Sequence, residues 1–160
     1  MKIKNGFTLV ELMIVVAIIS ILSMIGYPSY MTFIKDSRRA DAQSALMGFA
    51  QAMEHHYLTL GTYKGAAVGG DTGTPRIFST KSPIDGASAY YNLKIVSAGA
   101  ASYLIGAEPL DAQAGDGVLI LKSTGARGWN VSNSANGLLA SLGDSPNEVV
   151  PSEQCWKEGC

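Results

Sequence analysis

Charged side chains are scarce in this chain of 160 residues: Asp, Glu, Lys and Arg make up 16%, and the net charge is −1. A chain so close to neutral has no bulk electrostatic attraction to nucleic acid. The sequence also lacks a G-x4-G-K-[ST] loop, the phosphate-binding motif of many ATPases. It contains no evident nucleophile–base set or metal cluster, so we expect no catalytic, cofactor-binding or metal-binding residues. An enzyme is therefore the least favoured class.

Cysteine is also rare. Cys155 and Cys160 are the only two, and they form a C-x4-C pair at the C-terminus. A closed zinc site normally has four ligands, which this pair cannot supply. If the domain lies outside the cytoplasm, a local disulfide is favoured over free thiols. We therefore predict a disulfide between Cys155 and Cys160, with a small stabilisation because the loop it closes is short.

A long apolar run follows the first six residues. Residues 7–25 read FTLVELMIVVAIISILSMI, and Glu11 is the only ionisable side chain among these 19 residues. As a helix this run would be about 28 Å long, close to the hydrocarbon thickness of a bilayer. Lys2 and Lys4 precede it and favour a cytoplasmic N-terminus. The run therefore predicts one membrane-spanning helix with the rest of the chain outside.

This run has two simpler interpretations. A secretory signal peptide fits poorly, because the apolar stretch is too long and no A-x-A-like cleavage site follows it. A plain membrane anchor leaves Glu11 unexplained, since an acidic side chain at a helix centre in the bilayer costs roughly 2.5–3.5 kcal/mol. We therefore expect Glu11 to have a partner.

The basic leader ending at Gly6, followed by FTLVE, resembles the type III signal of type IV pilins and type II secretion pseudopilins. The resemblance implies that prepilin peptidase cleaves after Gly6 and that Phe7 becomes the N-methylated N-terminus. It also implies that Glu11 pairs with the terminal amine of a neighbouring subunit during filament assembly. Opposite charges attract strongly in a low-dielectric bundle, where either alone would be an unpaired buried charge. Pairing of Glu11 with Phe7 of its own chain, at i and i+4, is also geometrically available.

Helical periodicity continues after the apolar run, and the apolar residues fall on one face. They are Ile34, Ala42, Ala45, Leu46, Phe49, Met53, Tyr57 and Leu60. A helix over residues 7–57 would be about 77 Å long. Pro28 should kink or break it, because proline removes a backbone hydrogen bond and clashes with the preceding turn.

Two groups of basic or titratable residues lie on this helix. Lys35, Arg38 and Arg39 form a small basic cluster, which we interpret as a solvated face rather than a contact with phospholipid headgroups. His55 and His56 are adjacent, so their side chains point about 100° apart and do not readily chelate one ion. We predict that His56 is packed and that His55 is solvated.

The remaining sequence reads as a small sheet after a glycine-rich loop. Residues 89–96, 101–108 and 117–123 have strand character and predict antiparallel strands with one polar face and one face on the helix. From Thr124 on we predict an irregular loop. Its NVS sequence at Asn130 is interpreted as an ordinary polar loop rather than a glycosylation site. Trp129 and Trp156 are expected in the core.

Two stretches, residues 42–63 at the end of the expected helix and residues 90–129 in the expected sheet, resemble PilE-like minor pilins. Family members commonly carry a cysteine at the start of the third strand, where this chain has Gly117 or Val118. We therefore do not expect the family's long-range disulfide in this chain.

The sequence thus predicts an α+β protein with the lollipop architecture of pilins, in which a long N-terminal helix packs on an antiparallel sheet. The expected segments follow one another along the chain. They are a leader peptide (1–6), a transmembrane and filament-core helix (7–27), the amphipathic second half of the helix (28–60) and a globular head (61–160).

The function implied by the resemblance is that of a structural subunit of a type IV pilus, with a minor subunit favoured over a major one. The pilus would support twitching motility, adhesion or DNA uptake. Expected partners are other pilin subunits, prepilin peptidase, the inner-membrane assembly platform, and lipid before assembly. The location would be the bacterial inner membrane and then the extracellular pilus.

The alternatives are a type II secretion pseudopilin and a membrane-anchored adhesin or DNA-binding module. The linear sequence shows no clustered basic or aromatic surface that would support binding of DNA or of a surface ligand.

Overall fold

The computed structural model describes residues 7–130 and Trp156. The chain divides into two compact units between Asp36 and Ser37, and each is described by itself. The elements, in order, are α1 (Leu9–Leu60), β1 (Lys81–Ser82), β2 (Tyr91–Ala98), β3 (Tyr103–Pro109), the short 3-10 helix η1 (Asp111–Gln113), β4 (Val118–Lys122) and β5 (Arg127–Asn130).

The first unit contains the apolar part of α1. Every side chain from Phe7 to Tyr30 is exposed. By length and composition this helix could cross a membrane, and none of its most apolar stretch is buried within the protein. An apolar surface of this size needs lipid or other helices to cover it.

Pro28 lies inside α1, which continues through it without a break. The hydroxyl of Thr32 donates a hydrogen bond to the carbonyl oxygen of Pro28 at 3.1 Å, so this carbonyl has a partner one turn further on. Of the two outcomes expected for Pro28, a break is not observed, and a kink stays a prediction.

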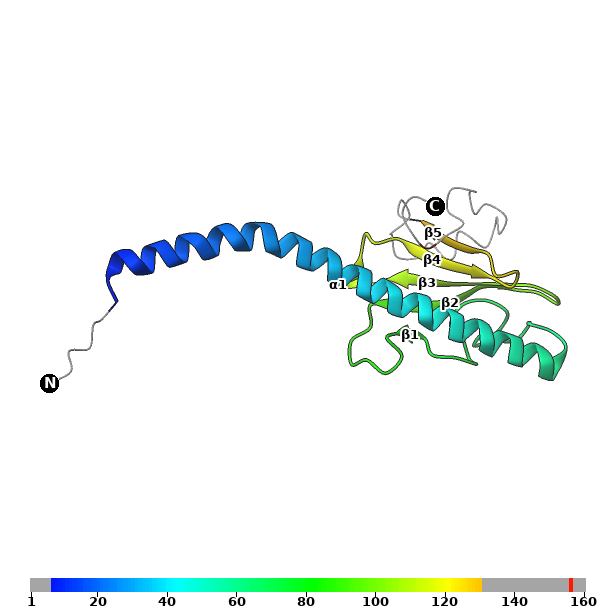
Figure 1. Ribbon diagram of the computed structural model, residues 1–160. Coiled ribbons are helices and arrows are strands. Elements are labelled where there is room, and N and C mark those ends of the chain that lie inside the picture. The colour runs from blue at the N-terminus through cyan, green and yellow to red at the C-terminus, as the bar shows by residue number, and fades with distance from the viewer. Residues whose placement is uncertain (1–6, 131–155, 157–160) are drawn as a thin grey trace. The chain divides into compact units, whose positions relative to one another are not determined.

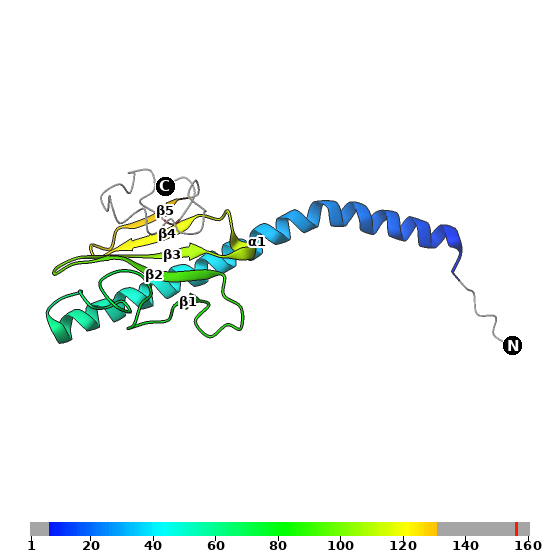
Figure 2. The ribbon, with the colours of Figure 1, turned by 180° about the vertical axis from the view of Figure 1, so that it is seen from behind.

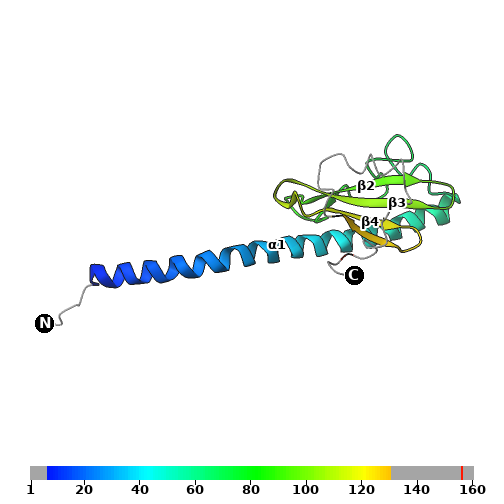
Figure 3. The same cartoon turned by 90° about the horizontal axis from the view of Figure 1, so that it is seen from above.

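The second unit packs the remaining turns of α1 against a five-stranded sheet (Figures 1 and 2). The strand order is β1-β2-β3-β4-β5 and every neighbouring pair is antiparallel. Viewed from above, the sheet lies along one side of this part of α1 (Figure 3). The predicted α+β class, a long N-terminal helix packed on a small antiparallel sheet, is confirmed.

The core forms where the periodic face of α1 meets the sheet. Ala42, Leu46, Phe49 and Met53 are fully buried there, as the spacing predicted. Leu60, expected on the same face, is 59% exposed because it is the last residue of the helix. Gly61 ends α1 with a φ of 71°, and its N–H donates to the carbonyl oxygen of Tyr57 at 2.7 Å, as is common for a glycine that follows a helix.

Three strands were predicted and two were missed. The predicted runs correspond to β2, β3 and β4, whereas β1 has only two residues and shows no alternation. The prediction of an irregular loop from Thr124 on was wrong at Arg127–Asn130, which pairs with β4 as strand β5. A strand of four residues is too short to show a clear alternation of apolar and polar side chains.

The expectation of one polar sheet face was also wrong. A second apolar cluster of Val96, Leu104, Val118 and Ile120 is buried on the face that points away from α1. All seven residues of β3 are buried, including Glu108, whose carboxylate pairs with Lys94 at 2.6 Å.

Candidate functional site

The first turn of α1 contains a reciprocal pair of hydrogen bonds between Thr8 and Glu11. The backbone N–H and the hydroxyl of Thr8 both donate to Oε2 of Glu11 at 2.9 Å. The backbone N–H of Glu11 donates in return to Oγ1 of Thr8 at 3.2 Å. This is a capping box, which satisfies backbone N–H groups that a helix leaves unbonded at its N-terminus.

Glu11 thus has a partner within its own chain, but Thr8 is not the partner that the sequence led us to expect. The T-x-x-E spacing of a capping box stands in the sequence and was the signal that could have revealed it. The negative carboxylate also lies at the positive end of the helix dipole, which is favourable.

The other predicted assembly residues are placed as follows. Phe7 is 86% exposed and precedes Thr8 directly, so Phe7 and Glu11 lie at the same end of α1. Pro28 lies farther along the helix. Gly6, Cys155 and Cys160 lie outside the described residues.

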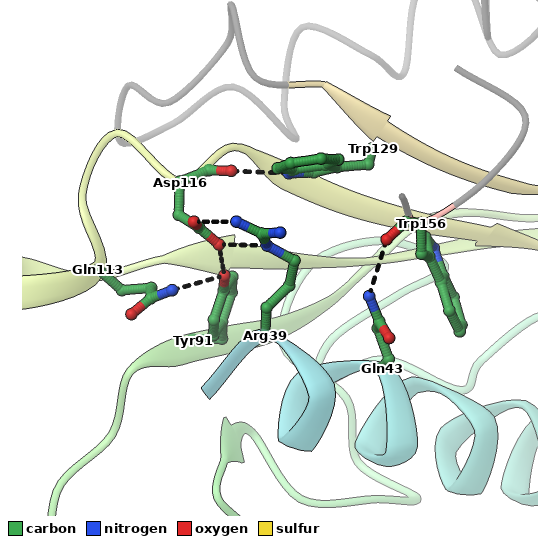
Figure 4. A network of polar contacts seen from close by, with 7 residues as sticks. All are labelled: Arg39, Gln43, Tyr91, Gln113, Asp116, Trp129 and Trp156. Carbon is green, nitrogen blue, oxygen red and sulfur yellow. Dashed lines mark hydrogen bonds and ion pairs between the residues drawn. The ribbon is translucent and has the colours of Figure 1, made fainter. Parts of the chain in front are cut away.

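A second polar constellation lies in the head and is centred on Arg39 (Figure 4). The Arg39 guanidinium binds the Asp116 carboxylate through two parallel hydrogen bonds, from Nε to Oδ2 at 2.8 Å and from Nη2 to Oδ1. The guanidinium also lies 3.9 Å from the centre of the Trp129 ring. The interpretation of Arg39 as part of a solvated face was wrong, since its side chain is only 17% exposed. The partner lies 77 residues away, where local spacing could not reveal it.

Asp116 accepts hydrogen bonds from several elements. The Tyr91 hydroxyl donates to its Oδ2, Gln113 donates to that hydroxyl oxygen at 3.2 Å, and the Trp129 indole donates to the Asp116 backbone carbonyl at 2.6 Å. Burial raises the pKa of the Asp116 carboxyl, but hydrogen bonds from Arg39, Tyr91 and Gln113 outweigh it, so the net pKa lies below the ordinary value. Burial, followed by the contact with Asp116, raises the pKa of Tyr91.

These shifts keep the carboxylate ionised and the phenol neutral at physiological pH. The positive and negative charges in the network neutralise each other. Such a closed ion pair is suited to holding α1 against the sheet rather than to acid–base chemistry.

Both tryptophans are buried, as predicted, and both contact this region. The backbone carbonyl of Trp156 accepts a hydrogen bond from the Gln43 side chain at 3.3 Å, and its indole donates to the carbonyl oxygen of Ile120 at 3.2 Å. Trp156 thereby connects α1 to β4. The neighbouring Arg38 lies 3.8 Å above the centre of the Tyr90 ring.

The prediction for the two histidines is confirmed. His56 is 8% exposed, and its Nε2 lies 3.0 Å from the carbonyl oxygen of Lys64, whereas His55 faces solvent. Within residues 7–130 and Trp156, no group of three or more His, Cys, Asp or Glu side chains could hold a metal ion.

Four basic residues lie at the end of the head where α1 finishes, here called the distal end. Lys64 and Arg76 belong to the loop after α1, and Lys122 and Arg127 flank the turn between β4 and β5. Backbone hydrogen bonds from Tyr63 to Gly99 and from Ser123 to Tyr103 hold these segments beside the turn between β2 and β3.

Two acidic residues also lie at the distal end, the exposed Glu54 and the half-buried Asp71, and both accept hydrogen bonds from neutral donors. Glu54 accepts hydrogen bonds from the Tyr63 hydroxyl, and Asp71 accepts one from the backbone N–H of Gly65. The linear sequence did not show this gathering of basic residues, because it arises from turns far apart in the chain.

Comparison with known proteins gives two family matches. Residues 28–117 match the family described as type IV minor pilin ComP, DNA uptake sequence receptor. Residues 1–27 match the prokaryotic N-terminal methylation motif.

Several curated proteins are similar in sequence. Fimbrial protein EcpC of Eikenella corrodens is 31% identical over 142 residues, which cover 84% of this chain and 86% of that protein. Prepilin peptidase-dependent protein D of Escherichia coli (strain K12) is 35% identical over 78 residues, 49% of this chain and 53% of that protein. Among solved structures, the non-core minor pilin PilV of Neisseria meningitidis aligns with a TM-score of 0.46 and 18% identity, over 61% of this chain and 88% of that one.

Proposed function

Since the chain belongs to the type IV minor pilin family and is a pilus subunit with an N-terminal methylation motif, we propose that its polymerisation depends on Gly6, Phe7 and Glu11. Prepilin peptidase cuts after Gly6, Phe7 receives the N-methyl group, and Glu11 pairs with the new amine of a neighbouring subunit. Before assembly the subunit lies in the inner membrane with its N-terminus in the cytoplasm. The assembly platform of that membrane then adds it to the fibre.

The observation that carries this proposal is the hydrogen bonding of Glu11 at the helix terminus. Its Oε2 accepts from the N–H of the peptide bond that joins Phe7 to Thr8. Cleavage after Gly6 would create a cationic amine one residue away, at the end of the helix where the carboxylate already points. In a bundle of apolar helices, that amine and a carboxylate from another subunit would each need a partner of opposite charge.

The test is to compare Glu11→Ala with Asp41→Ala, which removes an exposed acid from the same helix. Each variant is expressed in a deletion strain. The amount of subunit in sheared fibres is compared with the amount left in the membrane, and mass spectrometry identifies the N-terminal residue of the fibre protein. We expect wild-type and Asp41→Ala subunits in fibres to begin at a methylated Phe7. Glu11→Ala should be cut and inserted but largely absent from fibres. Fibre subunits that retain residues 1–6, or normal incorporation of Glu11→Ala, would contradict the proposal.

The sheared fibres of the same experiment also show whether the subunit is minor or major. A minor subunit should be a small fraction of the sheared fibre protein, whereas a major subunit should dominate it.

We also propose a second function, binding of DNA at the distal end. It is supported by the description of the matched family as a DNA uptake sequence receptor. The exposed side chains of Lys64, Arg76 and Arg127 and the half-buried Lys122 offer positive charge to phosphates. Binding of this kind should weaken steeply as salt rises, because each neutralised phosphate releases counterions.

The test is DNA binding by the full chain in detergent at several salt concentrations. Lys64→Ala combined with Lys122→Ala should lower the affinity for DNA. It should also make the slope of log K against log salt concentration shallower by about 2, because two fewer phosphates are neutralised. The matched control is Arg38→Ala combined with Lys81→Ala, which removes two cations outside the distal end. Absence of binding at low salt, or an equal effect of the control, would contradict DNA binding at this end.

A further inference from the structure

The apolar contact between α1 and the head only weakly fixes how far along the sheet the helix lies, and the close fit of Gly48 against Phe78 is a local exception. The main contributors to the apolar contact are Ala42, Leu46, Phe49 and Met53, spaced by three and four residues. Hydrophobic burial is non-directional, and apolar cores lose a unique arrangement before they lose stability. A slide by one turn, about 5.4 Å, would bring the next turn of the same apolar face over each strand.

Arg39 adds directional contacts to this apolar face, beside the hydrogen bond from Gln43 to Trp156. Its fork of donors matches the two oxygens of Asp116, which lies on the loop before β4. One of those oxygens also accepts from Tyr91 at the start of β2. The guanidinium plane covers Trp129 of β5. One side chain of α1 is thus tied to the loop before β4 and to strands β2 and β5.

This geometry distinguishes Arg39 from a general stabilising contact. A bidentate arginine–carboxylate pair has a narrow range of productive positions, and a one-turn slide would break the pair and remove the guanidinium from the indole. Breaking it would leave Asp116, only 5% exposed, as a buried charge without its cation. Shifted registers are therefore disfavoured much more strongly than the apolar contacts alone would disfavour them.

We propose that Arg39 is a positioning residue that, through Asp116, selects one register of helix α1 on the sheet. Buried polar pairs are best documented in this register-setting role. The consequence for the fibre rests on the pilus function. The head is presented identically in every subunit only when all subunits share one register, so a population of mixed registers is incorporated poorly.

The test variant is Arg39→Met with Asp116→Asn, which removes both charges so that neither is left buried alone. The matched control is Lys94→Met with Glu108→Gln, which removes another partly buried ion pair, between β2 and β3. Arg39→Lys keeps the charge but not the fork, and should behave more like the test variant than like wild type.

The register is read by fluorine NMR of the full chain in detergent, with 5-fluorotryptophan at the two tryptophans. Trp156 is the informative position, because it bonds both Gln43 of α1 and Ile120 of β4 and so reports their relative position. We expect one Trp156 resonance in wild type and control, and several or a broadened one in the test variant, with circular dichroism unchanged.

Incorporation into fibres is measured separately by complementation and shearing. We expect a loss of about tenfold for the test variant and less than twofold for the control. A single sharp Trp156 resonance in the test variant, or loss of its folded head, would overturn the register role. Multiple resonances with normal incorporation would uphold the register role, overturn its consequence for the fibre and leave the pilus function intact.

Discussion

The rings of Phe49 and Phe78 stack face to face, with their centres 5.3 Å apart and their planes 5° from parallel. Phe49 belongs to α1, and Phe78 belongs to the segment before β1. The stack depends on Gly48, because a Cβ at that position would lie 3.2 Å from the Phe78 ring. A glycine in the middle of a helix is therefore explained by the close approach of a ring from another segment.

We predict that Gly48→Val destabilises the head by roughly 1–3 kcal/mol, since an added β-branched side chain displaces Phe78. Thermal or denaturant unfolding of the full chain in detergent, followed by circular dichroism, measures the change. Gly26→Val is the matched control, because it is also a helical glycine and has no atom within 4 Å of an added Cβ. Equal effects of the two substitutions would contradict the role given to the Phe78 ring.

The capping box gives a prediction for Thr8. Thr8→Val removes the hydroxyl that donates to Glu11 and accepts from its backbone N–H, and loss of such a cap costs about 1 kcal/mol. We expect the first turn of α1 to exchange its amide hydrogens about fivefold faster, as hydrogen exchange with mass spectrometry can measure. Thr8→Ser retains the hydroxyl and should exchange as wild type does. Thr32→Val, which removes a hydroxyl bonded to Pro28, should leave the first turn unchanged.

Acid should weaken the ion pair between Asp116 and Arg39. Because the pKa of Asp116 is lower in the folded protein than in the unfolded chain, its contribution is present above the unfolded value of about 3.9 and is lost as pH falls through the folded value. At pH 7 we expect Asp116→Asn to cost about 1–3 kcal/mol, the range for a buried donor that loses its acceptor. The difference between wild type and variant should shrink below about pH 4. Unfolding measured from neutral to strongly acidic pH tests this, and a difference that stays constant with pH would refute it.

The sequence predicted those parts of the fold that are local and periodic. The face of α1 through Ala42, Phe49 and Met53 could be read because a helix repeats every 3.6 residues, and β2 to β4 because alternation persists over five residues or more. The family resemblance at Gly6 and Phe7 came from a contiguous motif.

What the sequence did not predict depends on tertiary contacts. The pairing of Arg39 with Asp116 spans 77 positions, and the short strand β5 is defined by its neighbour β4 rather than by its own pattern. The distal gathering of Lys64 and Lys122 likewise needs the turns to be brought together. Thr8 is different, because its T-x-x-E signal is local and stands in the sequence itself.

Alkaline pH should destabilise the head through its buried tyrosines. Burial raises the pKa of Tyr91, Tyr103 and Tyr63, and the neighbouring carboxylates of Asp116 and Glu54 add to the effect. A raised folded pKa gives stability that is complete below the unfolded value of about 10 and is lost as pH rises toward the folded value. These phenols should therefore ionise only as the head unfolds, so that part of the tyrosinate absorbance rises together with the loss of circular dichroism.

The seven tyrosines allow an internal comparison. Tyr103→Phe should remove one phenol from the late phase and reduce the alkaline loss of stability. Tyr30→Phe, which changes an exposed ring on the apolar part of α1 and lies outside the head, is the matched control. If every phenol titrated in one phase while the head stayed folded, burial would not control the ionisation of Tyr103, and the prediction would be wrong.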